Sequence, residues 1–304
     1  MQVEECMRAP LIYHMNLSYI YIYIYACTHA QVCEAEDNAQ WRSERLETRE
    51  FLRREWERGK MPSPIFSCFG IFTFLFKVDW LHCADQGVGA DFLGNLFAYL
   101  VAKKMPGARI EDRTSELAKL VREFYKENRV ADQLKEFLPK TFQAEKKTKK
   151  PPSLKGNAAS TRALIPFGDQ MAKRFLLDDE PIELAMKSAA HHLNNCYNSL
   201  SDDNKDFCHD ALYESSKQFA LHYGALHEFV GDGVAWRPRP KMHLFLELCS
   251  SGAEPQKFWN YRDEDFGGTV AKQSKMKGIW RKLSSYAKHA LDMYRMKNSV
   301  PKIN

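Results

Sequence analysis

The sequence lacks most of the features by which functional classes are recognised. Its eight cysteines include no Cys-x-x-Cys pair. This absence argues against zinc ribbons and a compact disulfide framework, so we expect reduced thiols in an intracellular protein. The sequence also has no P-loop, no nucleophile elbow and no Gly-x-Gly-x-x-Gly turn. The usual sequence signals of phosphate-binding loops and serine hydrolases are therefore absent. We infer neither a small-molecule ligand nor a resident cofactor.

Long apolar runs are missing as well. A membrane-spanning helix needs about 20 consecutive apolar residues, whereas the apolar run at 66–76 has only 11. The stretch at 11–27 is interrupted by polar residues, and Arg8 is the only cation before it. The stretch resembles at best a weak secretory signal peptide, because its n-region has a single basic residue. We therefore expect no membrane partner.

The N-terminal residues 1–33 have a repetitive character. The run YIYIYIY at 19–25 alternates with period two. As protein it is a strand-compatible ladder that would aggregate if exposed, but an in-frame T–A dinucleotide repeat would encode the same letters. We interpret residues 1–33 as a low-complexity, disordered segment.

The whole chain of 304 residues is 44% hydrophobic and 27% charged, which is enough apolar mass for a folded core. We predict a mainly α fold of one or more helical domains, with at most a short remnant of β-sheet near 65–78. The predicted segments after the N-terminus are a charged solvated helix (34–60), a strand plus helices (65–143), a basic proline-containing linker (144–160) and a helical domain with a basic C-terminal helix (161–304).

Apolar periodicity and start and stop residues set the expected helix bounds. Pro181 and Pro240 stand where the first residue of a helix is often proline, whereas Pro166 is expected to break or kink its helix. The predicted helices cover about 90–104, 111–128, 132–138, 160–176, 181–200, 201–230, 240–249 and 275–297.

Positive charge is concentrated near the C-terminus. From Lys272 to Lys297 the sequence has eight basic residues and one acid, a local charge of +7 in a chain whose total is +5. Such a segment suits sequence-independent contact with DNA phosphates, and a solvated surface helix is the alternative. The candidate DNA-binding residues are Lys272, Lys275, Lys277, Arg281, Lys282 and Lys288. A second lysine cluster at 146–150 fits either a nuclear localisation signal or a solvated linker.

Metal-ligand patterns are sparse. His192 and Cys196 are four residues apart on one predicted helix, a spacing that suits two ligands of one metal. Histidine and cysteine at such positions are more often part of a helical core. We predict no metal site from them.

Asp79 follows an apolar run and His82 comes three residues later, in VDWLHCADQGVGADFLGN (78–95). This stretch resembles the Asp-x-x-His-x-x-x-x-Gly-Val signature of RNase H-like cut-and-paste transposases of the CACTA and KDZ (Kyakuja-Dileera-Zisupton) type. WRPRPKMHLFLELCSS (236–251) is similar to the family's later Pro-Lys-x-His segment, and WNYRDEDFGG (259–268) stands where the family has its late acidic stretch. The resemblance covers about two thirds of the chain.

The resemblance implies specific roles. Asp79 would be the second carboxylate of an acidic triad and His82 its companion, with Glu264, or less favourably Asp263 or Asp265, as the third. The strand that carries the family's first aspartate has no counterpart upstream. We therefore expect a catalytically incomplete, transposase-derived protein, and Mg²⁺ would be its cofactor only if ancestral nuclease activity remained.

Two alternatives stay open from the sequence. Asp79 equally fits a residue that caps the start of a helix. The whole chain also fits an all-helical protein-interaction or scaffold module without a nucleic-acid role. The oligomeric state is not predicted.

Overall fold

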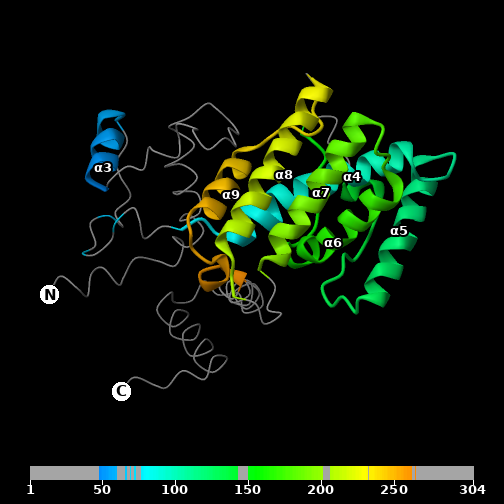
Figure 1. Ribbon diagram of the computed structural model, residues 1–304, viewed down its shortest axis with the longest axis horizontal. Helices are drawn as coiled ribbons and strands as arrows, with labels where there is room; N and C mark the ends of the chain where they lie inside the picture. The colour runs from blue at the N-terminus through cyan, green and yellow to red at the C-terminus, as the bar shows by residue number, and fades with distance from the viewer. Residues whose placement is uncertain are drawn as a thin grey trace, which may run out of the picture. The chain divides into compact units, whose positions relative to one another are not determined.

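The computed structural model describes residues 48–59, 66, 69, 72, 77–142, 150–200, 206–231, 233–261 and 264. The chain divides into two units, Met1–Phe258 and Trp259–Asn304. The described part is mainly helical, as predicted (Figure 1). Its α-helices are α3 (Thr48–Glu57), α4 (Ala90–Lys103), α5 (Ile110–Glu127), α6 (Ala158–Phe175), α7 (Pro181–Asn198), α8 (His209–Val230) and α9 (Pro240–Ser250). A π-helix, η5 (Leu81–Gly89), leads directly into α4, and 3₁₀ turns lie at Pro139–Thr141 (η6) and Pro255–Lys257 (η7).

The core forms around α4, which is apolar on almost every side. Leu93, Leu96 and Phe97 are completely buried, as expected for a helix enclosed by others. The ring of Phe97 lies 5.8 Å from that of Phe167 in α6, and Phe92 lies 5.8 Å from Phe219 in α8. Helix α4 therefore joins the two halves of the described bundle.

Helices α7 and α8 pack along each other, with α9 against α8 (Figure 1). Both helices contribute fully buried side chains to the core, including Leu193 and Cys196 of α7 and Leu212 and Leu226 of α8. Helix α9, with 11 residues, would be marginal in water in isolation, so its stability comes from tertiary burial.

Residues 152–154 cross close over α4, although they fall in the segment that we interpreted as a solvated linker. Leu154 is 4% exposed and donates its backbone N–H to the carbonyl of Ala90 (2.7 Å). A Cβ at Gly94 would overlap the backbone of Ser153, so this crossing requires glycine in α4. Residues 143–149 lie outside the described residues.

Five predicted helices, at 90–104, 111–128, 160–176, 181–200 and 240–249, are confirmed as α4, α5, α6, α7 and α9. Pro181 and Pro240 are the first residues of α7 and α9, as expected. The expectation of a break or kink at Pro166 is wrong as to the break, because α6 runs through Pro166 as one helix. The proline lies between the buried side chains of Ile165 and Phe167, and their packing offsets the lost hydrogen bond.

Two helix predictions differ from the structure. Residues 132–138 form no helix, because a seven-residue segment gains too little from helix formation to offset its nucleation cost. The chain instead enters η6 at Pro139, where the Thr141 hydroxyl accepts the backbone N–H of Leu138 (3.0 Å). Helix α8 begins at His209 after extended residues and not near 201, and residues 201–205 lie outside the described residues.

Other sequence-based predictions fall largely outside the described residues. Within 65–78 only residues 66, 69, 72, 77 and 78 are described, and none of these forms a strand. Residues 1–33 and the predicted basic helix at 275–297 are not among those described. No described helix is both long and apolar enough to cross a membrane.

Candidate functional site

Asp79 and His82 lie together at the start of the π-helix. The carboxylate Oδ2 of Asp79 is 2.5 Å from Nδ1 of His82 and accepts the backbone N–H of His82 at 3.2 Å. The backbone carbonyl of Asp79 accepts the N–H of Cys83 (3.1 Å). Asp79 is only 8% exposed. Asp79 therefore caps the start of this helix, which is one of the two roles that the sequence left open. The same carboxylate orients the imidazole of His82.

The π-helix η5 carries a second polar group on its inner side. Asp85 is completely buried and accepts the hydroxyl of Tyr197 in α7 (2.7 Å). The ring of Trp80 packs edge-on against Tyr197, 5.3 Å away. Burial raises the pKa of the Cys83 thiol, and the nearby Cys249 and the negative charges of Asp79 and Asp85 add to the effect. Cys83 is therefore held as a neutral thiol and is unsuited to nucleophilic attack.

Helix α9 approaches η5 at Gly87, where the backbone is non-helical (φ −121°, ψ −109°). A Cβ at Gly87 would come within 3.0 Å of Cδ of Lys241, so glycine permits the close approach. The Lys241 ammonium donates to the carbonyl of Gln86 (2.8 Å). Burial, followed by the positive charge of Arg239, lowers the pKa of Lys241.

The described residues contain no cluster of three or more His, Cys, Asp or Glu side chains arranged to hold a metal ion. The structure brings together two of the three residues implied by the transposase resemblance, Asp79 and His82. Glu264 belongs to the second unit, where it is exposed and its backbone N–H bonds to the carbonyl of Asn260 (2.9 Å). Asp263 and Asp265 lie outside the described residues, as do all six candidate DNA-binding residues of the C-terminal segment.

The other metal-ligand pattern does not converge in the described bundle. Cys196 is completely buried in α7, and burial raises the pKa of its thiol. The ring of His192 stacks instead on His222 of α8, with ring centres 5.7 Å apart and planes 10° from parallel. Burial is the main cause that lowers the pKa of His192, and the charges of His191 and His222 lower it further.

Sequence reasoning missed a buried polar network on α4. Asp91 is 5% exposed, and its carboxylate accepts Nε of Arg239 (2.6 Å) and the Ser153 hydroxyl (2.8 Å). A second nitrogen of Arg239 also pairs with Asp91. Asn95 donates to the carbonyl of Pro152 (3.0 Å) and accepts the backbone N–H of Trp236 (2.9 Å). The available signal was two polar residues four apart in an apolar helix.

The Asn95 contact supports an unusual backbone at Trp236. This residue has φ 57°, in the left-handed region that costs a bulky side chain free energy. Its indole ring is 3% exposed and packs 5.7 Å from the rings of both Phe92 and Tyr223. The contacts fix the start of the Arg-Pro-Arg-Pro connection that leads to α9.

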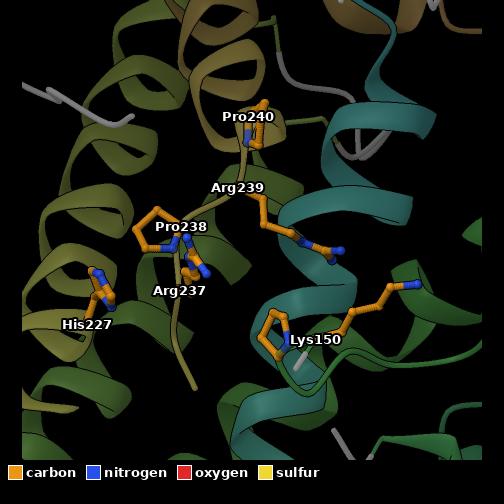
Figure 2. Close-up of a pocket in the computed structure, with 7 residues that line it drawn as sticks. Lys150, His227, Arg237, Pro238, Arg239 and Pro240 are labelled. Carbon is orange, nitrogen blue, oxygen red and sulfur yellow. The ribbon is translucent and has the colours of Figure 1, made fainter. Parts of the chain in front are cut away.

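Beside this network lies a groove of about 510 Å³. Figure 2 shows the two arginines on the connection before α9, His227 on α8 and Lys150 on the segment opposite. The described residues that line the groove are Lys150, Pro151, His227, Arg237, Pro238, Arg239 and Pro240. Three of the seven are cations and none carries a carboxylate, so the groove favours an anion. We name it the arginine–proline groove.

Comparison with models of protein families, with curated proteins and with solved structures finds no match to this chain.

Proposed function

We propose that this chain is a catalytically incomplete, transposase-derived protein that contacts DNA through phosphates and not through base edges. The observation that supports catalytic incompleteness is the pairing of Asp79 with His82 at 2.5 Å, whereas the transposase origin rests on the resemblance of the sequence segments. A carboxylate committed to a helix start and an imidazole has less capacity to bind a divalent metal. Metal-dependent phosphoryl chemistry needs several oxygen ligands around the ion, and none of the described residues supplies a third ligand beside this pair.

The proposed DNA contact rests on charge. The segment Lys272–Lys297 carries a local charge of +7. Each phosphate that a cation neutralises releases a condensed counterion, so the binding should weaken steeply as salt rises. Nothing in the segment suggests base readout, and we expect little sequence preference.

An electrophoretic mobility shift assay across a salt series tests the contact. The quadruple variant Lys275→Ala, Lys277→Ala, Arg281→Ala and Lys282→Ala should reduce the log–log salt slope by about 3 to 4. A matched control removes four exposed cations in and after α5: Lys119, Arg122, Lys126 and Lys135. We expect the control to retain the wild-type slope. If both variants lose the same amount of salt slope, the slope depends on the net charge of the chain alone, and a specific role for the segment is refuted.

The absence of catalysis is tested on the same DNA with Mg²⁺ added. We expect no metal-dependent cleavage. Cleavage by the wild type that Asp79→Asn abolishes would contradict the proposal, because it would make Asp79 a working ligand.

The second candidate function is a helical protein-interaction module. It is favoured by an apolar stripe on the outer side of α8, where Leu221 and Phe229 are 42% and 56% exposed, with Ala225 between them at helical spacing. Such a stripe suits contact with another protein. Absence of any DNA shift at low salt would leave this candidate as the better one.

A further inference from the structure

We propose that the arginine–proline groove binds a phosphate dianion, either free phosphate or the phosphate group of a small phosphomonoester. The proposal concerns residues in the first unit and does not depend on DNA binding by the C-terminal segment. It rests on the charge balance of the groove, an unpartnered buried nitrogen and the rigidity of the walls.

The charge balance favours a dianion. Arg239 is paired with the buried Asp91, so these two charges cancel. Lys150 and Arg237 remain, and neither forms an ion pair with another described residue. The described lining residues therefore contribute a net charge of about +2, which matches the charge of roughly −1.5 to −2 on a phosphomonoester near neutral pH. A phosphodiester carries only one negative charge and matches less well.

His227 supplies a further polar atom. Its Nδ1 is buried and has no hydrogen-bond partner among the described residues, while the side chain lines the groove. A neutral imidazole carries one N–H that can occupy either nitrogen. Because Nδ1 is closed to solvent, a rotation of the ring has to turn it toward the groove before it can donate to a phosphate oxygen. Such a rotation is favoured, since a buried polar atom left without a partner costs free energy.

The N-terminus of α9 adds a favourable field. This helix has 11 residues and starts at Pro240, which lines the groove. The partial positive charge at a helix N-terminus favours anions. Lys241 does not add to the site, because its ammonium is bonded to the carbonyl of Gln86 on the other side.

The walls of the groove are rigid before any ligand arrives. Pro151, Pro238 and Pro240 each have a fixed φ angle, and Arg239 is held by Asp91 and by the Ser153 hydroxyl (3.4 Å). A preorganised site loses less conformational entropy on binding. The volume of about 510 Å³ lies in the usual range for small-molecule sites, so a sugar or a base attached to the phosphate has room.

Isothermal titration calorimetry on the full chain tests the proposal with three probes: inorganic phosphate, a nucleoside 5′-monophosphate and the matching 3′,5′-cyclic phosphodiester. We expect saturable binding of at least one of the first two, and their relative affinities identify the source of the phosphate. The cyclic diester should bind at least about tenfold more weakly, because it lacks one negative charge and one oxygen acceptor.

Variants locate the site. Arg237→Gln should weaken binding about 10- to 100-fold, the usual loss for a charge-assisted hydrogen bond. Arg122→Gln removes an equal charge from exposed α5 and should leave the affinity unchanged. The four alanine substitutions in the C-terminal segment should also leave it unchanged, which separates this site from the proposed DNA contact. Circular dichroism and the unfolding midpoint verify that Arg237→Gln is folded.

His227→Gln provides a second test that leaves the cations in place. It should weaken binding by a smaller factor than Arg237→Gln. The proposal is overturned if neither phosphate probe saturates below about 10 mM, if the cyclic diester binds as tightly as the monoester, or if Arg122→Gln weakens binding as much as Arg237→Gln. Displacement of the nucleotide by duplex DNA without terminal phosphates would also overturn it.

Discussion

Asp79 and Asp91 are twelve residues apart, and both are buried carboxylates, with 8% and 5% of their surface exposed. They differ in how far along the sequence their hydrogen-bond partners lie. Asp79 bonds to His82, three residues away. Asp91 bonds to Ser153 and Arg239, which are 62 and 148 residues away. The recognisable motif, Asp79 with His82, is thus a local arrangement. Asp91, which belongs to no motif, connects three distant parts of the bundle.

This difference explains why the two acids should contribute unequally to stability. Loss of a capping carboxylate frees one backbone N–H at the helix start, which typically costs about 1 kcal/mol. Asp91 is a buried carboxylate that pairs with the half-buried Arg239, so its removal leaves a partly desolvated charge without its partner. The comparison therefore predicts a larger loss of stability at Asp91 than at Asp79.

Substitution of Asp91 should have the largest effect. Asp91→Ala leaves Arg239 without its partner and removes the acceptor of the Ser153 hydroxyl. We expect the free energy of unfolding to fall by about 2 to 3 kcal/mol, below the full cost of a broken buried pair because the Arg239 side chain is 38% exposed. Urea denaturation measures it.

Glu116→Ala is the matched control for Asp91→Ala. Glu116 pairs with Lys119 on the surface of α5, with 39% and 55% of the two side chains exposed. We expect a change below about 0.5 kcal/mol. If the two substitutions cost the same, Asp91 does not connect the bundle in the way inferred here.

Substitution of Asp79 should have an intermediate effect. Asp79→Ala removes the acceptor of the His82 backbone N–H and should lower the free energy of unfolding by about 1 kcal/mol. Asp79→Asn keeps an acceptor oxygen and should cost less. Urea denaturation with and without Mg²⁺ completes the test, because a ligand that binds only the folded state raises the midpoint. A Mg²⁺-dependent rise in the wild type that is absent in Asp79→Asn would revive the metal-site interpretation.

Local features of the sequence were sufficient to predict much of the fold. Pro181 and Pro240 marked two helix starts, and apolar periodicity marked the helix at 90–104. The capping role of Asp79 was one of two interpretations that the sequence left open, because its partner His82 is only three residues away. Each of these signals acts within one or two helical turns.

The features that sequence reasoning missed depend on distant partners. The polarity of Asp91 and Asn95 was visible, but no local pattern shows that Arg239 lies 148 residues further along the chain. The arginine–proline groove has the same origin, since Lys150 and Arg237 meet only after the bundle has formed. Helix 132–138 failed for a related reason, because periodicity over seven residues does not reveal whether tertiary contacts will support a helix.

The stacked pair His192 and His222 is another contact between distant parts of the chain, and its contribution to stability should depend on pH. Burial lowers the pKa of both imidazoles. As pH falls through the unfolded value of about 6.5, the unfolded chain takes up protons before the folded chain does. Stability from this pair is therefore complete above that pH and decreases below it. The effect should be the smallest of the three, under about 1 kcal/mol, because both rings are partly exposed to solvent.

The variant His222→Gln tests this pH dependence. Urea midpoints at pH 7.5 and 5.5 should differ less in the variant than in the wild type, since one of the two histidines no longer titrates and His192 loses a charged neighbour. His209→Gln, at the first residue of α8, is the control and should keep the wild-type difference. If His222→Gln keeps it too, the stacked pair does not determine the acid response.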